Sequence, residues 1–322
     1  MDEFALIDRI RARAGTAAGV ELGIGDDAAL LRPSPGQLLA VATDTLNAGV
    51  HFPETTAAAD IGHKALAVNL SDLAAMGASP EWCTLALSLP DADAAFVDAF
   101  LDGFLGLAER HAVVLVGGDT TRGPLSVTVT VGGRVPPGAA LRRDGARVGD
   151  AVFVTGTLGD AAAGLRQVLD AADPTAVSGP LRQRLDRPTP RLAAGLTLRG
   201  QASACIDLSD GLLGDLGHVL AASGVGAELA LAALPVSPAL AAVAKGPALW
   251  QLQLCGGDDF ELCFTAPEAA EAAIAAAMAA TGTPVARVGR IVPGGGLALR
   301  TPDGADFTPS GTAWRHFRGA DA

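Results

Sequence analysis

The sequence repeats one pattern: an apolar run ends at an aspartate that stands beside Gly, Ser or Thr. The aspartates that follow a run or lie in a Gly-rich turn are Asp26, Asp27, Asp44, Asp72, Asp119, Asp207, Asp210, Asp258 and Asp259. Apolar runs of strand length alternate with segments of helical spacing, which indicates an α/β or α+β fold. The 322 residues are 49% hydrophobic, which is enough to bury two separate cores.

The same periodicity sets the expected elements and the domain boundary. Helical spacing predicts helices over residues 2–14, 58–77, 91–110 and 272–280. Short apolar or alternating runs predict strands over 38–43, 82–89, 112–116, 125–134, 151–155, 202–206, 227–231, 261–265 and 285–291. Asp91 is the expected N-cap of its helix. The Val-Pro-Pro-Gly break at 135–138 predicts a boundary between domains 1–137 and 138–322.

Charge and cysteine content exclude several classes of function. The chain carries 23 basic and 35 acidic residues, a formal net charge of −12. Nucleic acid is therefore excluded as the main partner, because phosphate contacts need a basic face. The four cysteines form no C-x-x-C pair, which favours reduced, buried thiols. The first residues lack a signal-peptide pattern and the apolar tract 272–280 is too short to span a bilayer, so we expect a cytoplasmic protein without membrane contact.

Asp72 lies on a predicted helix, away from the apolar stripe of that helix. Its neighbours one turn away, three of them apolar, are Val68, Asn69, Ala75 and Met76. A carboxylate in such surroundings is costly unless it is paired or bound to a cation. Two interpretations of Asp72 remain open at this point: a partly solvated acid, or a metal ligand.

The aspartates as a group point toward a divalent cation. Each one alone is explained by a turn or an N-cap, since aspartate favours both. Gathered in one place, however, two like charges about 4 Å apart cost roughly 4 kcal/mol at an effective dielectric near 20. Mg²⁺ binds carboxylates together with substrate phosphates and removes that cost. The pattern therefore favours a nucleotide-dependent reaction.

The standard phosphate-binding motifs are absent from the sequence. There is no G-x-x-x-x-G-K-[ST] loop, no protein-kinase signature and no G-x-S-x-G nucleophile motif. Residues 23–28 match the dinucleotide fingerprint in form, but that motif needs a helix after its glycines. Pro33, Pro35 and Gly36 leave no room for one, so the match is rejected. No covalent mechanism is indicated.

Two short motifs occur once in each half of the chain. Leu-Ser-Asp stands at 70–72 and 208–210, and Gly-Gly-Asp stands at 117–119 and 256–258. The two aspartates are 47 residues apart in the first half and 48 in the second. The repetition is either a coincidence of common residues or a sign that each half contributes acids to a related kind of site.

The motifs taken together resemble the thiamine-monophosphate kinase family. They are Gly-Ile-Gly-Asp-Asp-Ala at 23–28, Thr-Asp-Thr at 43–45, His-Phe at 51–52, Lys-Ala-Leu-Ala-Val-Asn-Leu-Ser-Asp-Leu-Ala-Ala-Met-Gly at 64–77, Gly-Gly-Asp-Thr-Thr-Arg-Gly at 117–123, Val-Thr-Gly-Thr-Leu-Gly at 154–159, Ile-Asp-Leu-Ser-Asp-Gly-Leu at 206–212 and Gly-Gly-Asp-Asp-Phe-Glu-Leu at 256–262. The resemblance covers nearly the whole chain. The Gly-Asp pieces alone are shared by the wider superfamily of aminoimidazole-ribotide synthetase-like enzymes.

The resemblance implies both a fold and an activity. The fold is a two-domain, synthetase-like α/β (α+β) arrangement, with an N-terminal domain that binds ATP and Mg²⁺ and dimerises through its sheet. The activity is ATP-dependent phosphorylation of thiamine phosphate to thiamine diphosphate by a homodimeric kinase with several Mg²⁺ ions. One alternative is another ATP-dependent synthetase of the superfamily, acting on an amide or amidine. A second alternative is a non-catalytic regulator that binds a nucleotide or a metal.

The resemblance also implies roles for individual residues. It implies metal ligands at Asp27, Thr43, Asp44, Asp72, Asp119, Asp207 and Asp210. It implies contacts with ATP at Gly118, Asp119, Arg143 and Ser209. It implies contacts with thiamine phosphate at His51, Asp258 and Trp314. It further implies a catalytic role for Asp72, Asp119 and Asp210, with Asp72 bridging more than one ion.

The sequence departs from the family pattern at two positions. Asp258 stands where the family usually has glutamate, so the carboxylate is one methylene shorter and its contact with the substrate can pass through water. Ala42 stands where serine is frequent, which removes one side-chain ligand beside Asp44. Trp314 is open to two interpretations: packing, or stacking on a cationic aromatic substrate.

The expected chemistry agrees with the residues. The second pKa of a phosphate monoester is near 6, so the acceptor is already an anionic nucleophile at pH 7 and needs no general base. Positioning and charge neutralisation are then the main tasks of a phosphoryl-transfer enzyme. Arg143 and Arg122 are the flanking cations, and for Arg122 a structural role is an equal alternative.

Overall fold

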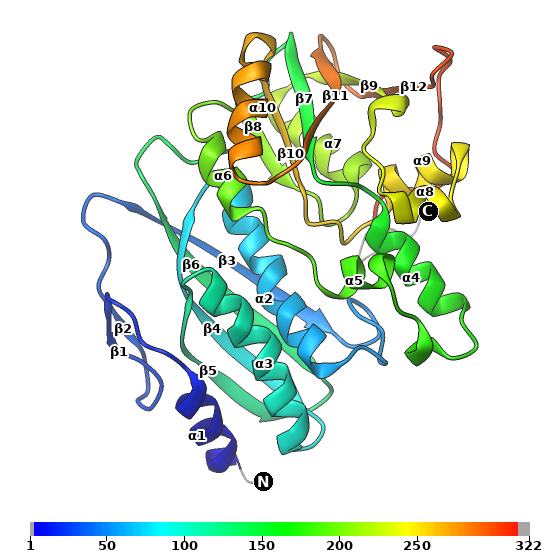
Figure 1. Ribbon diagram of the computed structural model, residues 1–322. Helices are drawn as coiled ribbons and strands as arrows, with labels where there is room; N and C mark the ends of the chain where they lie inside the picture. Colours follow the sequence, from blue (N-terminus) through cyan, green and yellow to red (C-terminus); the bar gives the residue numbers. More distant parts are fainter. Residues whose placement is uncertain (1–2, 315–322) are drawn as a thin grey trace, which may run out of the picture. The chain divides into compact units, whose positions relative to one another are not determined.

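The computed structural model describes residues 3–314, which form two compact units (Figure 1). Within the described residues, unit 1 contains 3–73 and 78–140. Unit 2 contains 74–77 and 141–314. The C-terminal end of helix α2 (Ala58–Ala75) thus belongs to unit 2, while the rest of that helix belongs to unit 1.

Unit 1 is built on a four-stranded sheet with the strand order β3-β6-β4-β5. Its strands are β3 (Leu38–Asn47), β4 (Ser79–Leu89), β5 (Val114–Arg122) and β6 (Ser126–Val135). Strand β6 pairs antiparallel with both β3 and β4. Strands β4 and β5 are parallel, and helix α3 (Ala94–Arg110) connects them, because parallel neighbours need a crossover.

The two faces of the unit 1 sheet differ in character. Val127, Val129 and Val131 of β6 are fully buried, and helices α2 and α3 cover that face (Figure 1). The residues between them point to the other face, since side chains alternate along a strand. There Thr130 Oγ1 lies 2.9 Å from Thr43 Oγ1, a hydrogen bond between β6 and β3.

Helices α2 and α3 approach each other closely because glycines lie at their contact. A Cβ at Gly62 would stand 2.0 Å from the carbonyl oxygen of Phe100. A Cβ at Gly103 would stand 1.7 Å from the carbonyl oxygen of Ala59. No side chain fits at either position, so the two backbones pack directly.

The N-terminal segment of unit 1 packs on helix α3. In helix α1 (Glu3–Arg13), Arg9 forms a bidentate ion pair with Asp98, and Arg13 lies 2.5 Å from Asp102. A small antiparallel pair follows, made of β1 (Val20–Leu22) and β2 (Leu30–Leu31). Residues 23–28 form the turn between these strands and contain no helix, which confirms the rejection of the dinucleotide fingerprint.

Unit 2 is built on a six-stranded sheet with the order β12-β9-β11-β7-β10-β8. All neighbours are antiparallel except β12 and β9, which are parallel. The strands are β7 (Asp150–Thr155), β8 (Ala204–Asp207), β9 (Gly226–Ala230), β10 (Leu262–Pro267), β11 (Val285–Val292) and β12 (Leu297–Arg300).

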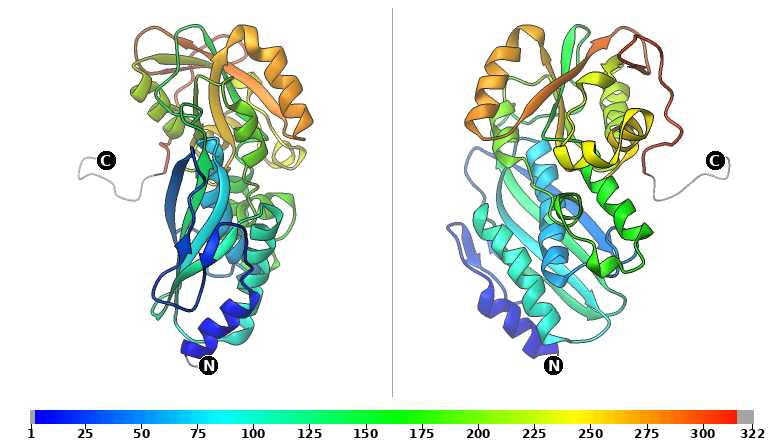
Figure 2. Two further views of the ribbon diagram at one scale, coloured as in Figure 1. Left: turned by 90° about the vertical axis from the view of Figure 1, so that its left-hand side faces the viewer. Right: turned by 45° about the vertical axis from the view of Figure 1, so that its right-hand side comes forward.

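Both faces of the unit 2 sheet are covered by helices. Val152 and Val154 belong to the same buried cluster as Leu216 of helix α7 (Leu212–Ser223). On the opposite face, Phe153 stacks on Phe264 with ring centroids 5.1 Å apart. Figure 2 shows helix α7 on one side of the sheet and α10 (Glu271–Ala280) on the other. This double burial explains why β7 reads as a continuous apolar run.

The remaining helices of unit 2 are short. They are α4 (Asp160–Asp170), α5 (Pro180–Asp186), α6 (Leu192–Leu198), α8 (Pro238–Val243) and α9 (Gly246–Cys255), with the 3₁₀ turns η1 (Pro174–Ala176), η2 (Leu231–Ala233) and η3 (Glu268–Ala270). None of the helices within residues 3–314 is long and apolar enough to cross a membrane. All four cysteines are free, and Cys255 is the least buried of them.

The predicted class is confirmed, but three local predictions are wrong. Strand β3 continues through Asp44 to Asn47, and β5 continues through the Gly-Gly-Asp segment to Arg122, because both keep pairing with a neighbour beyond their apolar part. The N-cap of α3 is Asp93 rather than Asp91: the Asp93 side chain accepts a hydrogen bond from the N–H of Ala95.

The two repeated motifs do not have repeated structures. Residues 70–72 lie within helix α2, whereas 208–210 lie in the loop between β8 and α7. Residues 117–119 lie within strand β5, whereas 256–258 lie in the loop before β10. The sequence repetition therefore has no counterpart in the local fold.

Candidate active site

Asp44 and Asp72 lie on two elements of unit 1 that Asn69 joins. Strand β3 is an edge strand, and the main-chain N–H of Asp44 donates a 3.0 Å hydrogen bond to Asn69 Oδ1. Asn69 is fully buried on α2, and its Nδ2 donates to the carbonyl of Ala65 at 2.9 Å. Asp72 follows Asn69 by three residues, so it lies one turn further along the same face. Both carboxylates are partly buried, and burial raises the pKa of Asp44.

Gly118 and Asp119 lie at the opposite edge of the same sheet. Strand β5 is the other edge strand, and the pairing runs from Asp44 through Val129 and Leu85 to Gly118. With strands about 4.8 Å apart, Asp44 and Gly118 are separated by about 14 Å. The acids of β3 and β5 thus lie on opposite edges of the sheet.

The backbone at Gly118 has no room for a side chain. Its φ of +153° is disfavoured for any residue with a Cβ. A Cβ at this position would lie 1.8 Å from the carbonyl oxygen of Leu85 on β4. The Gly-Gly-Asp motif therefore contains one glycine that the sheet requires. Asp119, the next residue, is exposed, and its carboxylate accepts a 2.9 Å hydrogen bond from the N–H of Thr120.

His51 lies in a tight turn that α2 supports. Its Nδ1 accepts a 2.9 Å hydrogen bond from the N–H of Asn47, and its carbonyl accepts a 3.0 Å bond from Lys64 Nζ. The bond to Nδ1 means that the proton of the neutral imidazole is on Nε2, which is then a donor. Lys64 is 1% exposed and is the largest fully buried side chain among the described residues.

The other two predicted ligands of unit 1 are solvent-exposed. Asp27 lies in the turn between β1 and β2, where its N–H donates to Asp26 Oδ1 at 2.9 Å. Thr43 lies on the open face of β3, where its hydroxyl is hydrogen-bonded to Thr130. Both residues are thus open to solvent in unit 1.

Unit 2 brings most of its predicted residues together through two loops. The loop 207–211 joins β8 to α7, and the loop 256–261 precedes β10. The N–H of Asp258 donates to the carbonyl of Ser209 at 2.9 Å, and the N–H of Phe260 donates to the carbonyl of Leu208 at 2.8 Å. The N–H of Trp314 donates to the carbonyl of Asp210 at 3.2 Å, so the indole-bearing residue also lies beside this loop. The Trp314 side chain is 50% exposed.

Asp215 anchors the loop 207–211 from helix α7. Its carboxylate accepts 3.1 Å hydrogen bonds from the N–H groups of Asp210 and Gly211. Burial, followed by the negative charges of Asp207 and Asp210, raises the pKa of Asp215 to about 7. Three acids, Asp207, Asp210 and Asp215, therefore lie close together at the N-terminal end of α7.

Arg143 lies far from the other predicted residues of unit 2. Its carbonyl accepts a 3.1 Å hydrogen bond from Ser223 Oγ, at the C-terminal end of α7. Asp210 precedes the N-terminal end of this 12-residue helix, which spans about 18 Å at 1.5 Å per residue. Unit 2 alone does not bring Arg143 to Ser209, although its exposed side chain is free to extend.

No complete metal site is formed within the described part of the chain. Among residues 3–314, no three His, Cys, Asp or Glu side chains lie close enough to hold one metal ion. The donors present are carboxylates and a threonine hydroxyl, which are the hard oxygen ligands that suit Mg²⁺. The donor chemistry of these residues therefore fits magnesium.

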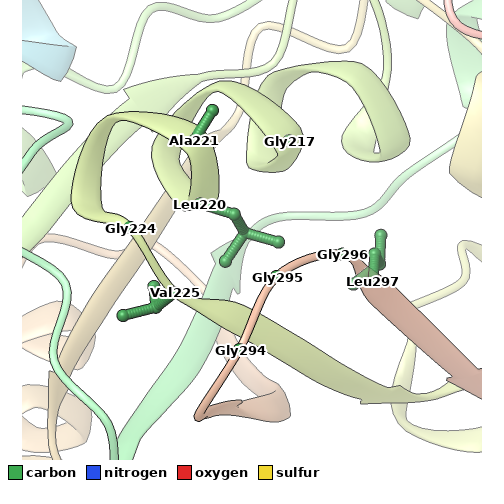
Figure 3. Close-up of a pocket in the computed structure, with 9 residues that line it drawn as sticks. All are labelled: Gly217, Leu220, Ala221, Gly224, Val225, Gly294, Gly295, Gly296 and Leu297. Atoms are coloured by element: carbon green, nitrogen blue, oxygen red, sulfur yellow. The ribbon is translucent and has the colours of Figure 1, made fainter.

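A separate pocket of unit 2 lacks the chemistry of this site. Figure 3 shows the residues that line it, which are Gly217, Leu220, Ala221, Gly224, Val225, Gly294, Gly295, Gly296 and Leu297. They come from the C-terminal half of α7, from the residues after it, and from the loop that leads into β12. The lining has no ionisable side chain, so this pocket is unsuited to a phosphate or a metal ion.

Four residues that position the site were not selected as candidates from the sequence. They are Asn69, Lys64, Asp215 and Glu261. Asn69, Lys64 and Glu261 were within the quoted motifs, and Asp215 follows one of them by three residues. Their contacts are to main-chain groups or to side chains distant in sequence, and spacing alone does not reveal such contacts.

Comparisons with known proteins define the class of the chain. Residues 25–135 match the AIR synthase related protein, N-terminal domain, and residues 147–301 match the corresponding C-terminal domain. Thiamine-monophosphate kinase of Escherichia coli (strain K12) is 49% identical over 299 residues, which cover 90% of both chains. The crystal structure of thiamine-monophosphate kinase from Stenotrophomonas maltophilia K279a is 52% identical, with a TM-score of 0.86 over 92% of this chain and 96% of that one.

A third similar protein was solved with ligands. The structure described as AaThiL complexed with AMPPCP and TMP is 32% identical, with a TM-score of 0.76, and covers 98% of this chain and 97% of that one. The fold and the two domain matches place the protein among the AIR synthase related enzymes. Within that class, the chain belongs to the thiamine-monophosphate kinase family, and it is a phosphotransferase with a phosphate group as acceptor.

Proposed function

We propose that the protein transfers the γ-phosphoryl group of ATP directly to thiamine phosphate, in line and without a phospho-enzyme. The observation that carries this proposal is the pair of hydrogen-bonded loops in unit 2, which holds Asp207, Ser209, Asp210 and Asp258 next to Trp314. The relative solved with AMPPCP and TMP supports the choice of the two substrates. No residue of this set is a nucleophile paired with a base, which favours direct transfer.

The acceptor itself supplies the nucleophile. A phosphate monoester is mostly a dianion at pH 7, so its oxygen attacks without loss of a proton to the protein. The barrier is then the approach of two anions, and the enzyme must position and neutralise them. In this proposal His51 contacts the acceptor phosphate, and its Nδ1 is oriented by the hydrogen bond from the N–H of Asn47. Trp314 stacks on the cationic ring system of the substrate.

Magnesium is the cation that this donor set suits. The residues that would hold it are Asp27, Thr43, Asp44, Asp72 and Asp119 of unit 1, and Asp207 and Asp210 of unit 2. When bound, the ions neutralise the phosphate oxygens and orient the γ-phosphoryl group for in-line attack. In this proposal Asp44 and Asp119 would hold different ions, since they lie on opposite edges of the unit 1 sheet. Gly118, Arg143 and Ser209 would contact ATP.

We also propose that the protein is a homodimer that associates through the open face of the unit 1 sheet. Leu39 and Val41 share this face with Thr43 and are 61% and 54% exposed. A sheet that is apolar on a second face needs a partner to cover it. A second copy of the same sheet is complementary by symmetry.

The test is product formation by the purified protein. With ATP, Mg²⁺ and thiamine phosphate we expect thiamine diphosphate, and with EDTA we expect none. Asp72→Asn should lower kcat by about 100-fold or more, since a site that stabilises developing charge loses about that much. Asp102→Asn is the matched control, because Asp102 is an exposed carboxylate on α3. Absence of thiamine diphosphate from the wild-type reaction, or equal activity of the two variants, would reject the proposal.

A further inference from the structure

The loop 256–261 has a backbone that must be held in place. Asp258 has a φ of +68° and Phe260 a φ of +48°, and both are residues with a side chain in the left-handed region. Such conformations persist only where the surrounding structure over-determines them. The hydrogen bonds to Ser209 and Leu208 hold one side of this loop. The other side of the loop needs a support as well.

The fully buried carboxylate of Glu261 fixes the C-terminal end of the loop. Glu261 is 0% exposed, and its two oxygens accept from Arg191 Nε and Nη2 at 2.6 Å each. They also accept from Thr155 Oγ1 at 2.7 Å and from Arg184 Nη2 at 2.9 Å. All of these donors lie on elements outside the loop, so Glu261 ties the loop to the frame of unit 2. We call these four side chains the Glu261 cluster.

The main chain leaves room for this cluster at Gly156. Gly156 has a φ of +59°, and a Cβ there would lie 2.0 Å from Glu261 Oε1. Arg184 Nη2 also donates to the carbonyl of Asp259 at 3.1 Å, which lies between the two left-handed residues. The Glu261 cluster therefore contacts the loop at the residue next to Asp258, and it does so with a charged hydrogen bond.

We infer that the Glu261 cluster is a positioning device for Asp258 and thereby for binding of the phosphate acceptor. Arg191 and Arg184 touch no substrate in this inference; they act through Glu261 and the backbone of Asp259. The inference rests on the proposed function for the role of Asp258. Ser209 and Asp210 have a second anchor besides the loop 256–261, because Asp215 holds the N–H groups of Asp210 and Gly211. The N–H of Leu208 in the same loop also donates to the carbonyl of Glu261 at 2.8 Å. Loss of the cluster should therefore affect the acceptor more than ATP.

The chain offers a matched variant and control on neighbouring elements. Arg191→Lys keeps the positive charge but loses the bidentate geometry that only a guanidinium provides. Arg182→Lys is the control, because Arg182 forms a buried ion pair with Asp186 within α5, the helix that also carries Arg184. Arg184→Lys is the milder second variant, since its side chain is 21% exposed.

Steady-state kinetics and hydrogen exchange together test the inference. For Arg191→Lys we expect the KM for thiamine phosphate to rise about tenfold, while the KM for ATP and kcat change by less than about threefold. Exchange at the amides of Asp258 and Phe260 should become at least tenfold faster. For Arg182→Lys we expect neither change. If Arg191→Lys does not fold, Arg184→Lys decides the matter with the same direction and a smaller rise.

Two outcomes would overturn the inference. In the first, the arginine variants and the control change both KM values equally, which is what a purely structural ion cluster predicts. In the second, loop exchange stays at the wild-type rate in every folded variant. Failure of the proposed function has a different signature: wild-type protein makes no thiamine diphosphate, while the exchange measurement still reports whether the cluster orders the loop.

Discussion

The two glycines of the Gly-Gly-Asp motif in strand β5 should respond differently to substitution by alanine, because only Gly118 has a backbone that excludes a side chain. Gly118→Ala places a Cβ 1.8 Å from the Leu85 carbonyl oxygen and forces a residue with a side chain to a φ of +153°. The unfavourable φ costs about 1–2 kcal/mol. The shift needed to relieve the overlap costs about 1–3 kcal/mol more. We therefore expect a loss of about 2–5 kcal/mol in the free energy of unfolding of unit 1.

The assay is urea denaturation followed by the fluorescence of Trp82, in a background where Trp250 and Trp314 are phenylalanine. With a urea slope of about 2 kcal/mol/M, the midpoint should fall by about 1–2.5 M. Gly117→Ala is the control, because nothing lies within 4 Å of a Cβ there. Its midpoint should stay close to that of the parent. A Gly118→Ala midpoint equal to that of Gly117→Ala would refute the strain argument.

Three further substitutions test other features of the fold. Burial raises the pKa of Asp259 well above its usual range. Above about pH 4 the unfolded chain releases this proton while the folded chain keeps it. The free energy of unfolding therefore falls as pH rises. Asp259→Asn keeps an acceptor for the N–H of Gly159 and should be more stable than wild type by a margin that widens from pH 5 to pH 8; a constant margin in urea titrations contradicts this sign. Gly62→Ala should cost about 1–3 kcal/mol, since its Cβ would lie 2.0 Å from the Phe100 carbonyl oxygen, whereas Gly106→Ala on the open side of α3 should gain about 1 kcal/mol. Thermal denaturation that shows the same direction for both glycine variants would contradict the close packing of α2 on α3.

The order and type of the elements could be predicted because apolar periodicity reflects burial. Helix α2 was expected over residues 58–77 and is observed over Ala58–Ala75. The strand ends were missed for a physical reason. The expected ends fell where apolar residues stop, but a β ladder pairs main-chain groups and tolerates polar side chains on an open face. Strand β3 therefore continues through Asp44 to Asn47.

For the candidate site, the sequence indicated the local motifs but not the residues that support them. Aspartates beside glycine are visible in a sequence, whereas their supports come from remote positions. Asn69 supports the main chain of a residue 25 positions away, and Arg191 pairs with Glu261 across 70 positions. No spacing rule links such partners, because the tertiary fold alone brings them together. The same limit explains why Arg143 was grouped with Ser209, although their main chains lie near opposite ends of α7.

The conformation of Asp258 gives a physical account of the departure from the family pattern at that position. With a φ of +68°, the residue lies in the left-handed region, where aspartate is tolerated better than longer side chains because its short polar group can bond locally. In the proposed role of Asp258, a glutamate there would reach further toward the acceptor but would add side-chain entropy to an already strained loop. Aspartate at this position therefore has a shorter reach than glutamate but adopts the left-handed backbone conformation at a lower cost. The position of the carboxylate then depends more strongly on the orientation of the loop, because a short side chain cannot compensate for a displaced Cα. The four donors that Glu261 receives are consistent with such a demand.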